Sequence, residues 1–371
     1  MVHKLEKLKV LIVDDTILYR KVLSAAVNST GIGIATHTAS NGKIALDHLK
    51  QRSFDVVLLD VVMPDMDGLE VLSVITEFYT EIFVIMISSE GSDSAANTFA
   101  ALKKGALDFI MKPQEDNAAK NMAILQKTLQ ALFLAVKVKK TGHSTQRTLK
   151  NQSLQEQSMI VTNHVIRNHR ALGVVCGKRD IDLIVIAAST GGPEALERIL
   201  KKLPKSLKQP ILIVQHMPKD FTKVLANIMN EKCNLQVTEA QQGDGIIPGQ
   251  VLIAPGGQHM LVGYDGCKMI VELSSAPYVN GVRPAADLLF RSVAGVYKGK
   301  NVLSVMLTGM GHDGTKGVME MKKECNCYCL AQSEGTCVVY GMPSSVVEAG
   351  LADEILDVED MATRIQKLCQ Q

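Results

Sequence analysis

The sequence predicts an α/β protein with two domains, each built on a parallel β-sheet that helices cover on both faces. Short, continuous apolar runs alternate with amphipathic stretches along the chain. This is the pattern of strands that are buried on both faces and joined by helices. The alternation occurs twice, on either side of a polar and basic segment. The length of 371 residues also exceeds that of a typical single domain.

The first domain is predicted to span residues 1–125, with five strands and a closing helix. The expected strands are KVLIV (9–13), GIGIATHT (31–38), DVVLL (55–59), IFVIMI (82–87) and LDFIM (107–111). Amphipathic stretches such as GLEVLSVITEFY and AANTFAALKKG separate them, and NMAILQKTLQALFLAV supplies the last helix.

A linker is predicted at residues 126–180. From 136 to 180 the chain is rich in Gln, Asn, Ser and Thr, and nine Lys or Arg residues stand against two acidic ones. A solvated connector, with helical turns at 154–172, is the favoured interpretation. Contact with an acidic partner or a lipid surface is the alternative.

The second domain is predicted to span residues 181–371, where the alternation resumes. The expected strands are DLIVIAA (182–188), PILIVQH (210–216), GQVLIAP (249–255), CKMIVEL (267–273), NVLSVMLTG (301–309) and CYCLAQ (327–332). Helical stretches lie between several of these runs, so a second parallel sheet is expected.

Composition excludes several classes of function. The net charge is only +2, so no global field favours nucleic acid or an anionic membrane, and no basic recognition helix follows the linker. No apolar run approaches the roughly 20 residues of a membrane span. The first residues, MVHKLEKLKVLIVDD, lack the apolar region of a signal peptide. We therefore expect a cytoplasmic protein that binds no nucleic acid.

The eight cysteines include the cluster CNCYC at 325–329. Its C-x-C-x-C spacing differs from the C-x2–4-C pairs that are usual in zinc sites. On a strand, alternate thiols share one face, where they pack as small hydrophobic groups. Burial is therefore favoured over metal binding.

Acidic and polar residues end the predicted strands of the first domain. They are Asp14 and Asp15, Asp60, Ser88 and Lys112. Because ligands gather at the carboxyl ends of parallel strands, these side chains are expected to converge. Carboxylates that close repel one another, and a hard cation such as Mg²⁺ relieves this repulsion. The pattern predicts a carboxylate that accepts a phosphoryl group, with Lys112 beside it.

In the second domain, Ser189 stands between an apolar run and a helix start in LIVIAASTGGPEALERIL. Three roles are open: an N-cap, part of a phosphate-binding turn, or a nucleophile. The phosphate role is the weakest, because STGGPEAL matches neither G-x-G-x-x-G nor a Walker A loop.

A nucleophilic serine needs a base and an orienting acid. Three histidines of the second domain are candidates: His216, His259 and His312. His216 is favoured over His259 because it directly ends a strand, as Ser189 nearly does. His312 adjoins Asp313 in the glycine-rich segment TGMGHDG.

In order and spacing, VDD, LLDVVMPDMDGLE, MISSEG and FIMKP resemble the receiver domain of two-component response regulators. The resemblance covers about residues 8–125 and implies a flavodoxin-like fold in which Asp60 accepts a phosphoryl group from a histidine kinase. It also implies Mg²⁺ ligands, switch residues and a phosphate-contacting lysine: Asp14, Asp15, Asp60 and the Val62 carbonyl; Ser88 and Phe109; and Lys112.

From residue 181 to 368, STGGPEAL, QHM, GDGIIPGQVLIAPGGQHM, NGVRPAADLLFRSVA, MLTGMGHDG and GTCVVYGMPSSVVEAG resemble the chemotaxis protein-glutamate methylesterase family. The resemblance implies a Rossmann-like domain that demethylates, and also deamidates, chemoreceptors. It implies a triad of Ser189, His216 and Asp313, with Thr190 and the Met310 N–H in supporting or oxyanion roles. Ala187 stands where the family usually has glycine.

Overall fold

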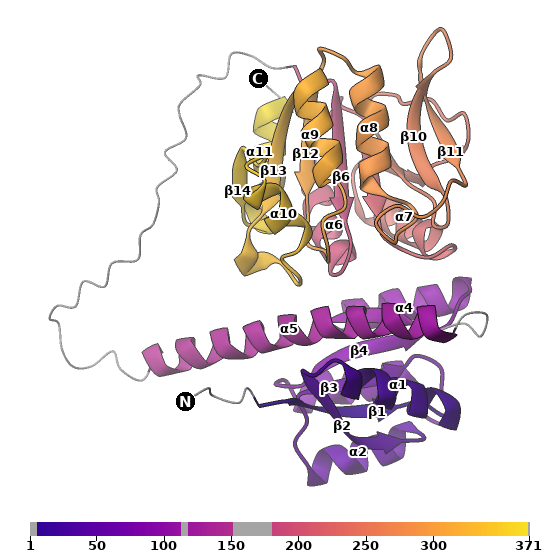
Figure 1. Cartoon of the computed structure of the whole chain (residues 1–371), viewed down its shortest axis with the longest axis vertical. Coiled ribbons are helices and arrows are strands. Elements are labelled where there is room, and N and C mark those ends of the chain that lie inside the picture. Colours follow the sequence, from indigo (N-terminus) through magenta and orange to yellow (C-terminus); the bar gives the residue numbers. More distant parts are fainter. Residues whose placement is uncertain (1–5, 113–117, 151–179, 370–371) are drawn as a thin grey trace, which may run out of the picture.

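The computed structural model describes residues 6–112, 118–150 and 180–369. It contains two α/β domains, and helix α5 lies between them along much of its length (Figure 1). No helix in these ranges is both long enough and apolar enough to span a bilayer.

The first domain has a five-stranded parallel sheet in the order β2-β1-β3-β4-β5. Its strands are β1 (Leu8–Val13), β2 (Gly33–Ala39), β3 (Val56–Asp60), β4 (Phe83–Ser88) and β5 (Asp108–Met111). Its helices are α1 (Ile17–Ser29), α2 (Gly42–Gln51), α3 (Gly68–Phe78), α4 (Ser92–Lys103) and α5 (Ala118–Lys150). Alternate residues of β1 enter different cores, Leu11 on one face and Ile12 on the other. This confirms the predicted sheet with two covered faces.

Helix α5 extends beyond the predicted closing helix, to Lys150. Leu125, Leu129 and Phe133 are buried in the core against α1, which holds the N-terminal half of α5 on the first domain. The helix therefore includes the first residues of the predicted linker, because no proline interrupts it there. The helical turns predicted at 154–172 lie outside the described residues.

The second domain has a seven-stranded parallel sheet in the order β14-β13-β12-β6-β7-β9-β8. Its strands are β6 (Leu183–Ala188), β7 (Ile211–Gln215), β8 (Gln236–Glu239), β9 (Gln250–Ile253), β12 (Asn301–Met306), β13 (Asn326–Gln332) and β14 (Glu354–Leu356). Its helices are α6 (Gly192–Leu200), α7 (Phe221–Lys232), α8 (Ala286–Val296), α9 (Thr315–Glu324), α10 (Met342–Glu348) and α11 (Val358–Cys369).

Four elements of this domain differ from the expectation, among them β10 (His259–Tyr264), which was not predicted as a strand. The apolar run at 267–273 joins no parallel sheet: it forms β11 (Met269–Ser274), which pairs antiparallel with β10 (His259–Tyr264) in a separate hairpin. The edge strands β8 and β14 were not predicted. They have only four and three residues, with Gln236 and Glu239 at the two ends of β8 and Glu354 at the start of β14, so they carry little apolar periodicity.

The order of the strands decides where chemistry can occur. β6 lies between β7 and β12, so the three carboxyl ends are neighbours. The segments that follow β6, β7 and β12 carry Ser189, His216 and Asp313, respectively. Ligands of open α/β sheets bind at such an edge.

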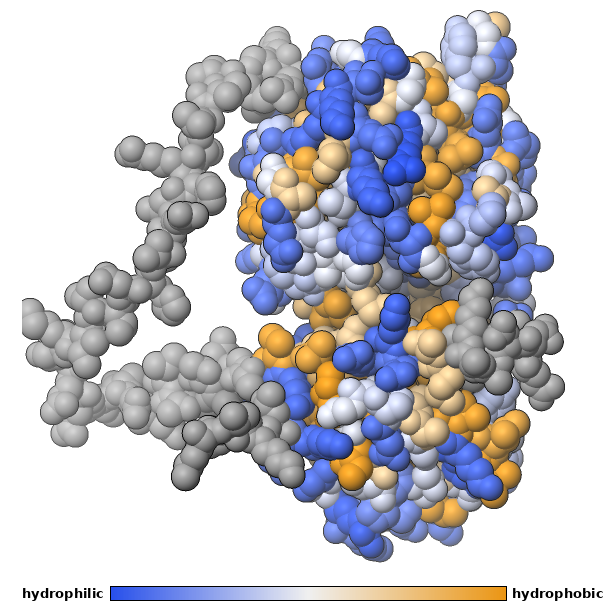
Figure 2. All heavy atoms as spheres, in the orientation of Figure 1, coloured by the Kyte–Doolittle hydropathy of each residue, from blue (hydrophilic) through white to orange (hydrophobic). Residues whose placement is uncertain are grey.

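The two domains meet through apolar side chains. Phe109 of β5 stacks on Phe221 of α7, with ring centroids 5.1 Å apart and planes at 11°. Ala95 and Phe99 of α4 belong to the same buried cluster as the core of the second domain. Figure 2 shows apolar side chains gathered at the seam between the domains.

Candidate functional site

The acidic residues of the first domain converge as predicted. Single carboxylate oxygens of Asp14, Asp15 and Asp60 lie within 4.8 Å of one another. The ammonium group of Lys112 is 2.6 Å from Asp60 Oδ2 and 2.9 Å from Asp14 Oδ2. The Val62 N–H donates to Asp60 Oδ1 at 3.4 Å, so the loop that carries the Val62 carbonyl runs beside these carboxylates.

Burial dominates the electrostatics of this site. It raises the pKa of Asp60 to about 6, against the opposing effect of the hydrogen bond from Lys112. Burial alone would lower the pKa of Lys112, but the hydrogen bonds to Asp60 and Asp14 hold it above its ordinary value. The Lys112 ammonium group thus contacts two of the three carboxyl groups. A set of hard oxygen donors with excess negative charge fits Mg²⁺.

The two predicted switch residues are engaged elsewhere. Ser88 is fully buried, and its hydroxyl lies 2.8 Å from both Ser94 Oγ and Thr98 Oγ1 on α4. The ring of Phe109 stacks on Phe221 in the second domain. In the described part of the chain, neither side chain hydrogen-bonds a carboxylate of the acidic site.

Ser189 lies in a tight turn between β6 and α6. The N-cap of α6 is Gly191, at φ +73°, so the serine does not cap this helix. The Ser189 N–H donates to Thr308 O at 3.0 Å, and its carbonyl accepts the Gly192 N–H at 2.7 Å. Glu194 in the first turn of α6 adds negative charge where a phosphate would bind, which disfavours the phosphate role.

His216 and Asp313 form a buried pair, with His216 Nε2 2.8 Å from Asp313 Oδ2. The same carboxylate accepts the N–H groups of Ala286 (2.6 Å) and Asp287 (3.2 Å) and the Asn280 amide (2.8 Å). Burial alone would raise the pKa of Asp313, but the hydrogen bond and charge of His216 hold it below its ordinary value. With Nε2 facing an ionised carboxylate, Nδ1 is the nitrogen left to act as a base.

The other histidine candidates have different surroundings. His259 is fully buried, with Nε2 3.1 Å from Pro277 O, and Nδ1 accepts the Ala285 N–H at 3.1 Å. Both ring nitrogens of His259 are therefore hydrogen-bonded to the main chain. His312 is exposed although it precedes Asp313. Of the three, only His216 hydrogen-bonds Asp313 within the described residues.

A cleft of about 700 Å³ lies between the two domains. Ser189, Thr190 and His216 line it from the second domain, and Lys112 lines it from the first. Residues of β5 and α5 form the facing wall: Asp108, Phe109, Ile110, Met111, Asn121, Ile124, Leu125 and Thr128. The serine and the histidine thus open onto one cleft, which the first domain covers.

The loop after β12 passes directly beside Ser189. A Cβ added to Gly309 would lie 2.6 Å from Ser189 Cβ, so only glycine permits this approach. The following residue, Met310, is 37% exposed. The Thr190 carbonyl accepts the hydroxyl of Thr308 at 2.9 Å, which ties the serine turn to the end of β12.

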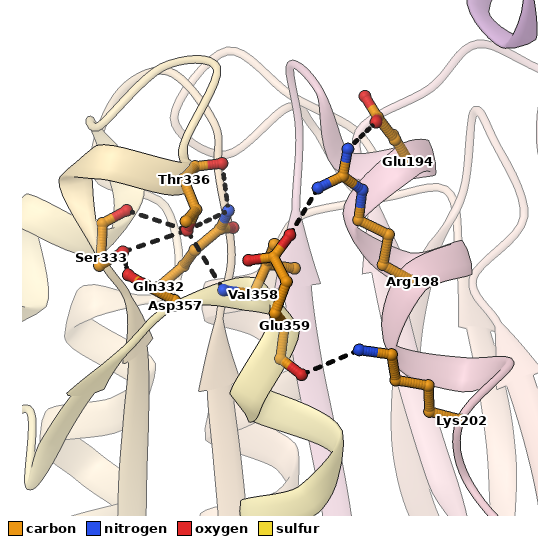
Figure 3. A network of polar contacts seen from close by, with 9 residues as sticks. All are labelled: Glu194, Arg198, Lys202, Gln332, Ser333, Thr336, Asp357, Val358 and Glu359. Carbon is orange, nitrogen blue, oxygen red and sulfur yellow. Dashed lines mark hydrogen bonds and ion pairs between the residues drawn. The ribbon is translucent and has the colours of Figure 1, made fainter. Parts of the chain in front are cut away.

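Figure 3 shows polar contacts that connect α11 with α6 on one side and with the residues at the end of β13 on the other. Arg198 on α6 donates to Glu359 Oε1 at 2.7 Å, and Lys202 donates to Glu359 O at 3.0 Å. The Gln332 amide donates to Thr336 O at 2.8 Å. The contacts of Glu359 help to fix α6 against α11, although exposed ion pairs of this kind contribute little energy individually.

Four residues at the site were not singled out by the sequence reasoning: Asp108, Gln215, Asn280 and Asp287. Burial raises the pKa of Asp108 to about 7, against the opposing effect of the polar groups of Phe109, Thr190 and Gly191 beside it. A carboxylate at the start of the apolar run LDFIM, and an amide next to His216 in QHM, were the available signals.

The cysteine cluster is part of the core. Cys325, Cys327 and Cys329 all pack in one apolar cluster. Burial raises the pKa of Cys327 to about 11 and that of Cys329 to about 12. A metal-binding cysteine must be a thiolate, so these thiols are poor ligands.

Comparisons with known proteins agree with this division of the chain. Residues 10–124 match the response regulator receiver domain, and residues 184–365 match the CheB methylesterase family. A protein-glutamate methylesterase/protein-glutamine glutaminase from Desulfotalea psychrophila is 38% identical over 97% of this chain and 98% of its own. Its namesake from Halalkalibacterium halodurans is 37% identical over 98% and 99%.

A solved structure also matches the second domain. The Thermotoga maritima CheB methylesterase catalytic domain is 41% identical to this chain, with a TM-score of 0.49 over 51% of this chain and 98% of that chain. The near full-length identity to the curated relatives decides the assignment. The chain therefore belongs to the family of protein-glutamate methylesterase/protein-glutamine glutaminase enzymes that carry a receiver domain.

Proposed function

We propose that this protein is a phosphorylation-controlled serine hydrolase that removes methyl groups from glutamate methyl esters of chemoreceptors and so serves sensory adaptation in chemotaxis. The observation that supports this most directly is the buried His216–Asp313 pair, which opens onto the same cleft as Ser189. A histidine kinase is the proposed phosphodonor.

The proposed reaction follows from the triad. Nδ1 of His216 takes the Ser189 proton as Oγ attacks the ester carbonyl carbon, and Asp313 stabilises the imidazolium. The methoxide leaves with that proton as methanol, and water then hydrolyses the acyl-serine to glutamate. Attack on a glutamine side chain would release ammonia by the same steps.

The loop beside Ser189 supports an oxyanion role for the Met310 N–H. Gly309 brings this loop against the serine turn, where a main-chain donor is placed to bind the developing negative charge. Such a donor is worth roughly 3 kcal/mol in the barrier. Thr190 would contribute from the same turn when its hydroxyl is free of Asp108.

In the receiver domain, Asp60 is the proposed phosphoacceptor. Asp14, Asp15, Asp60 and the Val62 carbonyl would hold Mg²⁺, which neutralises charge during phosphoryl transfer when it is bound. Lys112 already contacts Asp60 and is placed to hold a phosphoryl oxygen.

The proposed control is steric. The receiver covers the cleft of Ser189, and β5 carries both interface residues and the strand end next to Lys112. A phosphoryl group on Asp60 would attract the side chains of Lys112 and Ser88 and so loosen the interface between the two domains. To raise the open fraction from 1% to 50%, phosphorylation must shift the free energy of opening by about 2.7 kcal/mol. A new doubly negative group can supply this shift.

The test is methanol release from membranes that contain methylated receptors. Wild type and Ser189→Ala are compared, each with and without a small phosphodonor and Mg²⁺. The proposal expects release by wild type only, and faster release with the phosphodonor. Activity in Ser189→Ala would exclude the serine mechanism. Cleavage of small esters without receptor demethylation would indicate a different hydrolase.

A further inference from the structure

Gln215 is a buried polar residue with no role in the reaction described above. It is the last residue of β7 and directly precedes His216. Its side chain lies at the border of the cleft but is only 1% exposed. Because almost none of the Gln215 side chain is exposed, it cannot contact the substrate. Any role of Gln215 in the reaction must therefore act through other residues.

The amide of Gln215 contacts the main chain of both the nucleophile and the base. Nε2 donates to Ser189 O at 2.9 Å and to His216 O at 3.3 Å. These carbonyls belong to turns that follow two different strands, β6 and β7. One NH₂ group therefore links the two turns on which the geometry of Ser189 and His216 depends.

The neighbouring glycine shows how closely this amide is fitted. A Cβ added to Gly192 would lie 2.0 Å from Gln215 Oε1 and 2.9 Å from Ala188 Cβ. Gly192 has ordinary negative φ, so its backbone does not require glycine. The second glycine of STGG is therefore explained by the space that the Gln215 side chain occupies.

The oxygen of the Gln215 amide, unlike its nitrogen, makes no hydrogen bond within the described residues. Gln215 Oε1 is buried and has no hydrogen-bond partner among the described residues. A methionine of similar length would fill this space without burying an unpaired oxygen. The unpaired oxygen is a cost in stability that methionine would avoid, and what glutamine provides instead is its two donated hydrogen bonds.

We infer that Gln215 is a positioning residue, whose amide holds the turns of Ser189 and His216 in register for proton transfer. The inference rests on the proposed serine mechanism and adds to it a residue that touches neither substrate nor reacting atoms. A misplacement of about 1 Å between reacting groups costs on the order of 100-fold in rate. The effect is therefore expected in kcat rather than in KM.

The test compares Gln215→Met and Gln215→Glu with wild type in the full-length, phosphodonor-activated protein. Gln250→Met is the matched control, because Gln250 at the start of β9 also has a buried amide oxygen without a hydrogen-bond partner among the described residues. Methanol release from methylated receptor membranes gives kcat and KM, and thermal unfolding gives Tm. Labelling of Ser189 by a fluorophosphonate reports the Ser–His pair without receptor.

Both Gln215 variants are expected to lose roughly 10- to 100-fold in kcat and in labelling rate. KM should stay within about twofold of the wild-type value, and Gln250→Met should match wild type. A kcat within twofold of wild type in Gln215→Met, or losses that follow Tm equally in both Met variants, would overturn the inference. Ser189→Ala is included in the series: if it retains activity, the serine mechanism itself fails, whatever Gln215 does.

Discussion

The buried carboxyl group of Asp108 in the receiver domain lies beside Thr190, the residue after Ser189, and interacts electrostatically with its hydroxyl. The same carboxyl group also interacts with the Gly191 N–H, so one receiver side chain faces two positions of the serine turn. The receiver therefore does more than cover the cleft. It also engages a hydroxyl that the proposed mechanism places in a supporting role.

Replacing Asp108 by alanine should raise the basal activity. The variant loses the interactions of the Asp108 carboxyl group with Thr190 and Gly191, and a hydrogen bond between neutral groups is worth about 0.5–1.5 kcal/mol. We expect methanol release without phosphodonor to increase on the order of tenfold. Asp47→Ala, at an exposed position of α2, is the control for loss of a carboxylate. An unchanged basal rate in Asp108→Ala, with normal phosphorylation, would show that this contact does not restrain the enzyme.

The contact between the domains should weaken as the pH rises. Burial raises the pKa of Asp108 from 3.8 to about 7 in the closed arrangement. Opening exposes the group, so the closed form binds more protons than the open form. Linkage then makes closure most favourable at low pH, and this advantage is lost progressively up to about pH 7.

The measurement is the ratio of basal activity between wild type and Asp108→Asn from pH 5.5 to 8. The ratio cancels the pH dependence of the catalytic step itself, which both proteins share. It should rise with pH and level off above about 7, where Asp108 is ionised in both forms. A flat ratio across this range would contradict the role of Asp108 in closure.

Asn280 should be needed for the orientation of Asp313. Its amide donates to Asp313 Oδ1 at 2.8 Å and to Asp287 Oδ2 at 2.9 Å, and it lowers the pKa of Asp313. Asn280→Ala should reduce kcat about tenfold and move the acidic limb of the pH–rate profile to higher pH. Since Asn280 has φ +54°, Asn280→Gly is the control that favours this backbone. Activity retained in the glycine variant would assign the effect to the backbone.

The strand ends of both sheets could be predicted from the sequence because each apolar run stops at a polar residue. Asp14, Asp60 and Lys112 converge for this reason, and so do the turns of Ser189 and His216. The distinction between His216 and His259 could not be made this way. Both follow apolar runs, and only the fold of the segment between β11 and α8 brings Pro277 and Ala285 to the two ring nitrogens of His259.

The contacts between the domains were beyond sequence reasoning. Asp108 and Phe109 belong to a strand of the receiver, and their partners Thr190 and Phe221 lie in the other domain. Local periodicity describes a residue's own sheet and carries no information on what docks against it. Gln215 could not be identified from the sequence for a similar reason. Its role depends on the two main-chain carbonyls that its amide contacts, and the sequence does not show these contacts.

Asp60→Asn should separate the two activities of the chain. The amide keeps the size of the side chain but cannot accept a phosphoryl group, and Lys112 keeps its contact with Asp14 at 2.9 Å. Basal methanol release should therefore stay within about twofold of wild type, whereas the phosphodonor and Mg²⁺ should no longer raise it. Chelation of Mg²⁺ should have the same effect on wild type, because Asp14, Asp15 and Asp60 form the proposed metal site. Stimulation that persists in Asp60→Asn would place the phosphoacceptor at another residue. Stimulation that survives chelation would remove the metal from the proposal.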